Sequence, residues 1–308
     1  MVSKYLSIIL AAASIAMADA PPSSKAEWAP APGGLGAVLN SGPNGGLNGL
    51  PHSTYTKTKW PWGKLPKHCY DAAVGGKCDV YKVEAYDIQY SDCNLGANVM
   101  CRCETAQVTI DQLASDFGKV PVKARQWVSY VSAWPDSSCS AGSSNNRIDV
   151  YGDCTNSASV YFHEVAHSLD SWATGTNGAQ AWSLGQEWRD RVSWDSCVSD
   201  YYAKASYPES WAQVAVMAAY HAGVKSVWEL QPSMGCMANQ MNKVIEQLVN
   251  NPIMKRVAGQ TCDRRWPDDE TVCMGPDAVA AGACNGVARR DEIEAAEKAK
   301  RMEKRFIA

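Results

Sequence analysis

Twelve cysteines constrain the fold of this chain more than any other feature of its 308-residue sequence. They are even in number and spread over most of the sequence, at Cys69, Cys78, Cys93, Cys101, Cys103, Cys139, Cys154, Cys197, Cys236, Cys262, Cys273 and Cys284. In an oxidising compartment this set predicts six disulfide bonds, but the spacing does not determine the pairing. A cysteine zinc site is the competing interpretation. The C-x-C spacing of Cys101 and Cys103 argues against it, because zinc knuckles use C-x-x-C.

Residues 1–18 have the pattern of a secretory signal peptide. Lys4 provides a positive charge, an apolar run follows from Tyr5 to Ala16, and Ala16-Met17-Ala18 is a small-x-small cleavage sequence. The apolar run is too short to span a bilayer, which argues against a membrane anchor. We therefore expect a secreted, extracellular protein, in agreement with the cysteine content.

Composition divides the rest of the chain into three parts. Residues 19–65 are rich in Pro, Gly, Ser and Asn, so we expect them to bury little surface and to form a linker or a propeptide. Residues 66–285 carry the cysteines and form the predicted disulfide-stapled domain, in which the weakly periodic part 66–105 predicts a loop-rich lobe. Residues 286–308 are a charged tail. The formal net charge of −3 gives no indication of a nucleic-acid partner.

The spacing of apolar residues predicts an α+β fold, with helices packed on a small mixed sheet. Strands are expected at 124–134 and Arg147–Tyr151, and helices at 157–172, 179–195, 208–222 and 240–257. The helix at 157–172 can take its N-cap oxygen from Thr155 to Ser157. The helix at 208–222 has Ser206 near its cap, Pro208 in its first turn and Gly223 as its stop signal.

His163, Glu164 and His167 form the sequence H-E-V-A-H within the helix expected at 157–172. Positions i and i+4 of a helix share one face, so the two imidazoles can bind one metal ion from the same side. Glu164 lies where its carboxylate can reach a water molecule on that metal. The pattern predicts Zn2+ as the cofactor and Glu164 as the general base, which takes a proton from the attacking water.

A catalytic zinc usually has three protein ligands, so a third must come from elsewhere in the chain. Glu209 is the candidate, because a carboxylate at the start of the second helix can face the first. The alternative is that Glu209 only complements the helix dipole. Asp170, on the same helix face as His167, is a rival ligand, although we expect it to orient a ligand histidine through a hydrogen bond. His221 is expected to be a packed or surface residue.

Two tyrosines precede Glu209 closely enough to reach the same centre. Tyr202 and its neighbour Tyr201 are candidate donors to the oxyanion that forms when water attacks a carbonyl carbon. A packing role is the alternative for either residue. The strand Arg147–Tyr151 comes just before the metal helix and could pair with an extended peptide substrate.

The sequence HEVAHSLD at 163–170, followed by Tyr202 and by YPESWAQ at 207–213, resembles the catalytic domain shared by anthrax lethal factor and related zincins. The resemblance covers residues 145–222, approximately one quarter of the chain. The chain departs from the family pattern at Ala166, where Gly is frequent, at the Pro directly before Glu209, and at a Trp in place of the usual Phe. None of these departures removes a ligand.

This resemblance implies a zincin-like metallopeptidase fold and assigns a role to each matching residue. The zinc ligands that it implies are His163, His167 and Glu209. By the same resemblance, Glu164 is the general base and Tyr202 is the oxyanion donor. Asp170 is the residue that orients a ligand.

Over its whole length, the chain is similar to the conidiation-specific secreted proteins of filamentous fungi, which share its signal peptide, Pro/Gly-rich segment and dispersed cysteines. This resemblance implies an extracellular protein that is made around spore formation and associated with the spore or the cell wall. The resulting hypothesis is a secreted, monomeric zinc endopeptidase that acts on a peptide or protein substrate, with no nucleic-acid or membrane partner. The alternative is a non-catalytic secreted or spore-surface protein that retains a metal-binding zincin scaffold.

Overall fold

The computed structural model describes residues 21–29 and 34–285, so the predicted signal peptide (1–18) and charged tail (286–308) lie outside the described residues. The strands are β1 (Ala26–Ala29), β2 (Tyr55–Lys59), β3 (Lys64–Pro66), β4 (Val83–Tyr90), β5 (Asn98–Cys103), β6 (Tyr130–Trp134), β7 (Ser140–Ser144), β8 (Arg147–Tyr151), β9 (Cys197–Asp200) and β10 (Thr271–Cys273). The α-helices are α1 (Gly34–Leu39), α2 (Lys67–Ala72), α3 (Ile110–Lys119), α4 (Val122–Arg125), α5 (Ala158–Trp172), α6 (Gln186–Trp194), α7 (Tyr207–Gly223), α8 (Ala238–Ile245) and α9 (Pro276–Ala280).

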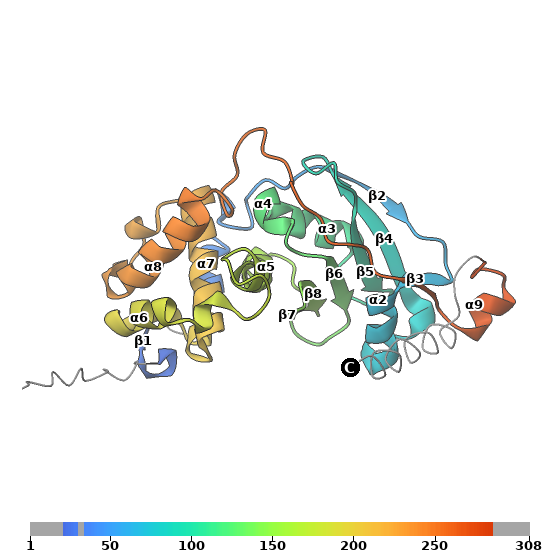
Figure 1. Cartoon of the computed structure of the whole chain (residues 1–308), viewed down its shortest axis with the longest axis horizontal. Helices are drawn as coiled ribbons and strands as arrows, with labels where there is room; N and C mark the ends of the chain where they lie inside the picture. The colour runs from blue at the N-terminus through green and yellow to red at the C-terminus, as the bar shows by residue number, and fades with distance from the viewer. Residues whose placement is uncertain (1–20, 30–33, 286–308) are drawn as a thin grey trace, which may run out of the picture.

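One mixed sheet of six strands has the order β2-β4-β5-β6-β8-β7. β4 pairs antiparallel with β2 and β5, the pairs β5-β6 and β6-β8 are parallel, and β7 pairs antiparallel with β8. Figure 1 shows this sheet at one end of an elongated molecule and α6, α7 and α8 at the other end, with α5 between them. The predicted α+β class, with helices on a mixed sheet, is confirmed.

Helices cover both faces of the sheet at its centre. Successive side chains of a strand point to opposite faces, so Tyr90 and Cys101 of the paired strands β4 and β5 lie on different sides. The Tyr90 hydroxyl donates to the backbone oxygen of Ala114 on α3, and Cys101 is joined by a disulfide to Cys69 on α2. Strands covered on both faces are buried throughout, as the five buried residues of β6 show.

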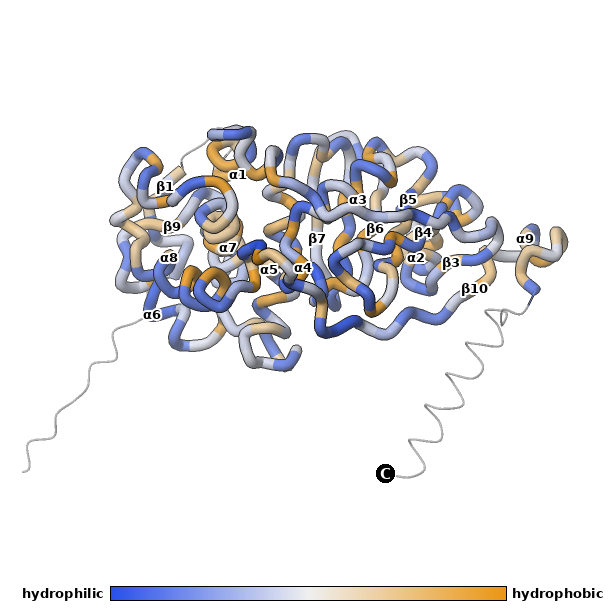
Figure 2. Tube along the Cα trace, turned by 90° about the horizontal axis from the view of Figure 1, so that it is seen from above, coloured by the Kyte–Doolittle hydropathy of each residue, from blue (hydrophilic) through white to orange (hydrophobic). Residues whose placement is uncertain are grey.

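The helices α5 and α7 pack against each other between the sheet and the helical end. Tyr161, Val165 and Leu169, four residues apart along α5, are fully buried, as is Trp211 on α7. Figure 2 shows apolar residues along both helices. The two helices expected at 157–172 and 208–222 are therefore confirmed, each within one residue of its predicted ends.

The N-terminal segment packs more extensively than its composition predicts. The expectation that residues 19–65 bury little is wrong for the described part, because Leu35, Leu39 and Leu47 are completely buried. Leu35 and Leu39 are four residues apart and so share one face of α1. In addition, β2 joins the sheet and β1 pairs with β9. A few well-spaced leucines are therefore enough to pack this segment against the core, despite its high Pro and Gly content.

This segment also caps α5. The N-cap residue Ser157 makes no side-chain capping bond, so the prediction of a cap between Thr155 and Ser157 is wrong. The backbone N–H of Ala158 instead donates to Asn48 Oδ1 at 2.9 Å, and that of Ser159 donates to Asn40 Oδ1 at 2.8 Å. Long-range partners thus satisfy free donors of the first helical turn.

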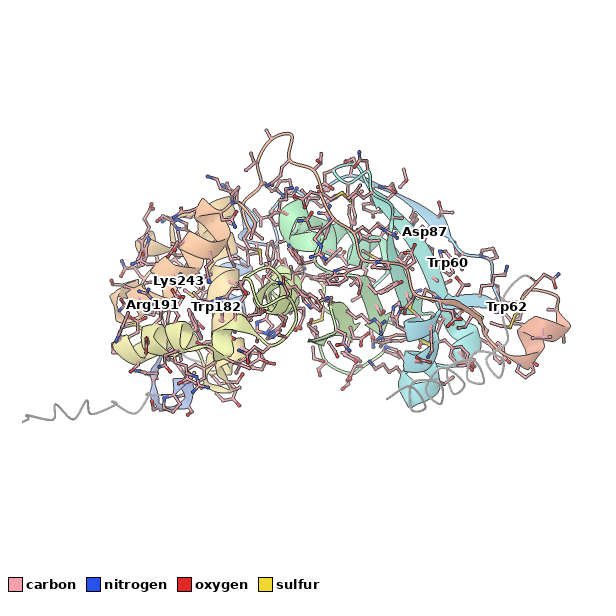
Figure 3. All side chains as sticks on the ribbon, viewed as in Figure 1. Trp60, Trp62, Asp87, Trp182, Arg191 and Lys243 are labelled. Atoms are coloured by element: carbon pink, nitrogen blue, oxygen red, sulfur yellow. A yellow bond between two sulfur atoms is a disulfide. The ribbon has the colours of Figure 1, made fainter. Side chains whose placement is uncertain are left out.

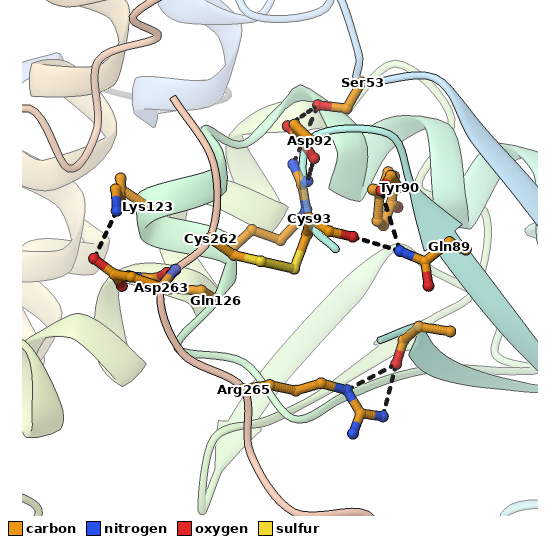
Figure 4. Close-up of a disulfide and its surroundings, with 12 residues drawn as sticks. Ser53, Gln89, Tyr90, Asp92, Cys93, Lys123, Gln126, Cys262, Asp263 and Arg265 are labelled. Carbon is orange, nitrogen blue, oxygen red and sulfur yellow. Dashed lines mark hydrogen bonds and ion pairs between the residues drawn. A yellow bond between two sulfur atoms is a disulfide. The ribbon is translucent and has the colours of Figure 1, made fainter. Parts of the chain in front are cut away.

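All twelve cysteines lie in the described residues and form the six predicted disulfides. The pairs are Cys69–Cys101, Cys78–Cys103, Cys93–Cys262, Cys139–Cys154, Cys197–Cys236 and Cys273–Cys284. Figure 4 shows the Cys93–Cys262 bond beside an ion pair between Lys123 and Asp263, 2.6 Å apart. The expected loop-rich lobe at 66–105 is wrong, because α2, β4 and β5 together account for half of it, and both strands belong to the six-stranded sheet. Pairing with neighbouring strands decides their structure despite weak periodicity.

Three further expected elements are shorter than predicted, whereas the strand expected at Arg147–Tyr151 is confirmed as β8. The strand predicted at 124–134 divides into α4 and β6, and the helix at 179–195 into a 3-10 turn at Trp182–Leu184 and α6. The helix at 240–257 ends as an α-helix at Ile245.

Figure 3 shows tryptophans at both ends of the molecule: Trp60 donates to Asp87 at 2.9 Å, and the ammonium of Lys243 lies 5.8 Å from the Trp182 ring. None of the described helices is long and apolar enough to cross a membrane.

Candidate metal centre

Two helices bring the sequence-predicted ligands together. His163 and His167 lie one turn apart on α5, and Glu209 lies in the first turn of α7. Ser206 starts α7 as predicted, because its hydroxyl oxygen accepts a hydrogen bond from the backbone N–H of Glu209 at 3.2 Å. Pro208 occupies the first turn, where its missing N–H has no helical partner to lose. The local capping pattern therefore places the Glu209 side chain opposite α5.

The three donor atoms face one common point. His163 Nε2 lies 2.9 Å from Glu209 Oε2, His167 Nε2 lies 3.3 Å from the same oxygen, and the two Nε2 atoms lie 3.1 Å apart. The imidazole rings meet edge to face, with centroids 4.8 Å apart and an interplanar angle of 85°. Both Nε2 atoms thus point toward the carboxylate.

This donor set fits a small divalent cation. A tetrahedral site with metal–ligand bonds of about 2.0 Å has ligand–ligand separations of about 3.3 Å, and the observed separations lie close to that value. Two imidazoles and one carboxylate are also ligands that zinc accepts. A second cluster in the described part of the chain is His68, Cys69 and Cys101. It does not fit, because its two sulfurs are bonded to each other.

The charges of the centre are coupled. Burial alone would raise the pKa of Glu209, but hydrogen bonds from His163 and His167 outweigh burial and lower this pKa to about 2. Burial alone would lower the pKa of His167, but the hydrogen bond and charge of Glu209 raise it. The Glu209 carboxylate is therefore ionised at neutral pH, as a metal ligand must be.

Glu164 lies beside the three donors between two pockets. Its side chain is buried, and burial raises its pKa, with the negative charge of Glu209 adding to the effect against the two histidines. One pocket, of about 260 Å³, includes Leu35, Val160 and Tyr202 in its lining. The other, of about 480 Å³, contains Glu209 and the edge of β7. Glu164 lines both pockets, so it faces the place where a substrate would cross the centre.

Tyr202, rather than Tyr201, belongs to this site. The Tyr202 ring centroid lies 5.4 Å from that of His163, and Tyr202 lines both pockets. Burial raises the pKa of its hydroxyl, and the charges of Glu209 and Glu164 raise it further, so the hydroxyl stays protonated and can donate. Tyr201 is 71% exposed and lines neither pocket.

Asp170 has a different partner from the one expected. Its Oδ1 accepts from the backbone N–H of Ser183 at 2.9 Å, and its Oδ2 accepts from the Ser183 hydroxyl at 2.6 Å. Burial raises the pKa of Asp170 to about 6, although the bonds from Ser183 oppose this shift. The expected hydrogen bond from a ligand histidine is replaced by one that ties α5 to the turn at Trp182–Leu184. Helical spacing predicted the face of α5 on which Asp170 lies, but it could not predict that the turn with Ser183 packs against that face.

The sequence analysis missed two residues behind His163. His163 Nδ1 lies 3.0 Å from Gln213 Oε1, and Gln213 Nε2 donates to Asp200 Oδ2 at 2.8 Å. Gln213 follows Glu209 by one helical turn, so helix spacing could have identified it. No local pattern marks Asp200. His221, at the other end of α7, is half-buried and accepts a hydrogen bond from the backbone N–H of Val227 at 3.3 Å.

The edge strand nearest the centre is β7. The suggestion that Arg147–Tyr151 pairs with a peptide is wrong, because this strand, β8, already lies between β6 and β7. Among the described strands, β7 pairs with β8 alone, and Ala141 of β7 lines both pockets. The free edge beside the centre is therefore provided by the Ser- and Gly-rich strand β7.

Comparison with known proteins gives the family. The model of the conidiation-specific protein Con-13 family matches residues 34–304. The chain belongs to this family. It is similar to conidiation-specific protein 13 of Neurospora crassa, with 45% identity over 282 residues, which cover 91% of this chain and 80% of the relative. No solved structure matches the chain. The predicted resemblance to conidiation-specific proteins is thus confirmed.

Proposed function

We propose that this Con-13 family protein is a secreted zinc-dependent endopeptidase. The observation that carries the proposal is the convergence of His163, His167 and Glu209 on one point, with the buried carboxylate of Glu164 beside them. The same residues match the motif of the lethal-factor-like zincins, and a zincin-like catalytic domain is part of the proposal.

In the proposed hydrolysis, Glu164 and Tyr202 have separate roles. Zinc, when bound, lowers the pKa of water and polarises a carbonyl group. Glu164 accepts the proton of the attacking water, and its raised pKa suits a base that later returns this proton to the leaving amine. The Tyr202 hydroxyl donates to the oxygen of the attacked carbonyl as negative charge develops there.

The substrate is proposed to be an extended peptide. The free edge of β7 can add one strand through backbone hydrogen bonds, which recognises a peptide without regard to its side chains. The pocket of about 260 Å³ beside His163 is walled by Leu35, Ala141 and Val160, so it suits an apolar side chain next to the scissile bond. The six disulfides suit an oxidising, extracellular compartment, and we propose that the protein acts there as a monomer.

Metal analysis and hydrolysis test the proposal together. The purified chain is expected to contain one equivalent of zinc and to cleave unfolded casein in a reaction that a chelator stops. The Glu164→Gln variant is the matched control, because it keeps the size and the three ligands while removing the base. It is expected to retain zinc and to lose turnover by about 10²–10⁴-fold. Cleavage by this variant at the wild-type rate would overturn the role of Glu164.

A second candidate is a non-catalytic secreted or spore-surface protein that keeps a metal site. The name of the Neurospora crassa relative refers to conidiation and to no reaction, so the comparisons favour this candidate over the endopeptidase. Retention of zinc without cleavage of any unfolded protein, in wild type and Glu164→Gln alike, would support this second candidate.

A further inference from the structure

We infer that Asp200 is a positioning residue for the candidate metal centre. Through the side-chain amide of Gln213, Asp200 fixes His163 in the tautomer that carries its proton on Nδ1 and its lone pair on Nε2. The inference deepens the proposed function, because it concerns how the chain prepares one ligand for the metal. It rests on a chain of two hydrogen bonds, from Asp200 to Gln213 and from Gln213 to His163.

The orientation of the Gln213 amide follows from the chemistry of its partner. Both carboxyl oxygens of Asp200 accept hydrogen bonds from backbone N–H groups, so the amide nitrogen of Gln213 faces Asp200 Oδ2, 2.8 Å away, as a further donor. The amide oxygen then faces His163 Nδ1 at 3.0 Å. The reversed amide would place two acceptors against each other. Gln213 and Asp200 are at most 9% exposed, so water has little access to relieve that contact.

The amide oxygen in turn determines where the imidazole proton sits. An oxygen acceptor at Nδ1 requires an N–H on Nδ1, so the neutral His163 ring is left with its lone pair on Nε2. That lone pair faces Glu209 Oε2 at 2.9 Å, which is also an acceptor. Contact at this distance therefore needs either a proton shared by the two atoms or a metal ion bound by both. The tautomer imposed by Gln213 is therefore the one that a metal ion requires.

Asp200 also positions two other parts of the site through backbone hydrogen bonds. Its Oδ2 also accepts from the backbone N–H of Leu35 at 2.9 Å, and its Oδ1 accepts from that of Ala203 at 3.1 Å. The first bond fixes the N-terminal wall of the apolar pocket, and the second fixes the turn that carries Tyr202. Gly34 permits this approach, because its φ is +51° and a Cβ there would lie 2.9 Å from Asp200 Oδ2.

Zinc affinity and the histidine tautomer test the inference in the full chain. The Asp200→Asn variant keeps the shape but allows the Gln213 amide to reverse, so zinc binding is expected to weaken about 10–100-fold in competition with a chelator. In the zinc-free protein, nitrogen NMR of labelled histidine is expected to show the proton of His163 on Nδ1 in wild type. In the variant, this single-tautomer signal is lost.

Asp195→Asn is the matched control. Asp195 is also a buried carboxylate that accepts backbone hydrogen bonds, from Asn239 and Gln240, but it has no contact with the centre. It is expected to lower stability comparably and to leave zinc affinity and tautomer unchanged. If Asp200→Asn fails to fold, Gln213→Leu provides the same readouts, because Asp200 then keeps its bonds from Leu35 and Ala203.

The outcomes separate this inference from the proposed function. A His163 ring in the wild type that carries its proton on Nε2 and none on Nδ1 overturns the inference. Wild-type zinc affinity in Asp200→Asn or Gln213→Leu also overturns it. A wild-type protein that holds the Nδ1 proton but binds no zinc supports the tautomer assignment and removes the endopeptidase. A catalytically silent protein whose zinc affinity depends on Asp200 supports the inference as well.

Discussion

Asn48 accepts a hydrogen bond from the backbone N–H of Ala158, so the cap of the helix that carries both candidate histidine ligands comes from a residue far away in the sequence. We expect Asn48→Ala to lower the free energy of unfolding by about 1 kcal/mol, the usual effect of losing a side-chain cap. Urea unfolding measures this value. Ser157→Ala is the control, because Ser157 is the N-cap residue by position but makes no capping bond. Equal losses in both variants would contradict the long-range cap.

Removal of Glu209 is expected to weaken zinc binding more than about 100-fold. Loss of a residue that only hydrogen-bonds a metal ligand typically costs about 10–100-fold in affinity. The reason is that Glu209→Ala deletes one of three donor atoms, whereas the histidines remain. Competition with a chromophoric chelator gives the affinity. Asp170→Asn serves as the comparison, since the Asp170 carboxylate is bonded to Ser183. An unchanged affinity in Glu209→Ala together with a large loss in Asp170→Asn would transfer the third ligand position to Asp170.

Asp170 makes stability depend on pH in a defined direction. Burial raises its pKa in the folded protein to about 6, above the value of about 3.9 in an unfolded chain. Between these values the folded state binds the proton more tightly. The contribution of Asp170 is therefore fully present below about pH 4 and is lost as pH rises through about 6. The Asp170→Asn variant does not titrate at this position.

Urea unfolding of the chelated protein from pH 4 to pH 7 checks this prediction. The stability of the wild type relative to Asp170→Asn is expected to fall as the pH rises across this window. A difference that stays constant with pH would show that the carboxyl group titrates alike in the folded and unfolded states.

The disulfides are expected to contribute unequally to stability. Cys93–Cys262 closes a sequence separation of 169 residues, whereas Cys273–Cys284 closes one of 11. Replacing both cysteines of the longer loop by serine should cost about 4 kcal/mol, and more than the same change in the shorter loop, because a longer loop restricts the unfolded chain more. Denaturant midpoints of the two double variants provide the comparison. A larger loss for the Cys273–Cys284 variant would contradict this entropic order.

Local sequence patterns predicted the parts of the site that lie on single helices. The i and i+4 spacing of His163 and His167 and the start signals around Ser206 and Pro208 are short-range features, and helix physics turns them into positions. Once both helices exist, their packing brings Glu209 opposite the histidines. These residues could therefore be identified without knowledge of the rest of the fold.

The parts that the sequence did not reveal depend on contacts between distant residues. Hydrogen bonds join Asn48 and Asn40 to the first turn of α5, and Asp200 to Leu35 in the N-terminal segment. Each of these bonds joins residues more than a hundred positions apart. A single sequence does not show which distant residues will pair. The edge position of β7 likewise depends on which strand lies beside β8. Composition was also misleading, because Leu35 and Leu39 sit in a stretch whose Pro and Gly content suggested no packing.

The placement of the N-terminal segment has a consequence for biosynthesis. Asn40 and Asn48 leave the ribosome well before α5, whose first turn they cap, and Leu35 leaves it before Asp200. The nascent chain therefore has no assembled centre until residues up to Gln213 have emerged. If the protein is a peptidase, this order prevents a partly synthesised chain from cleaving other proteins.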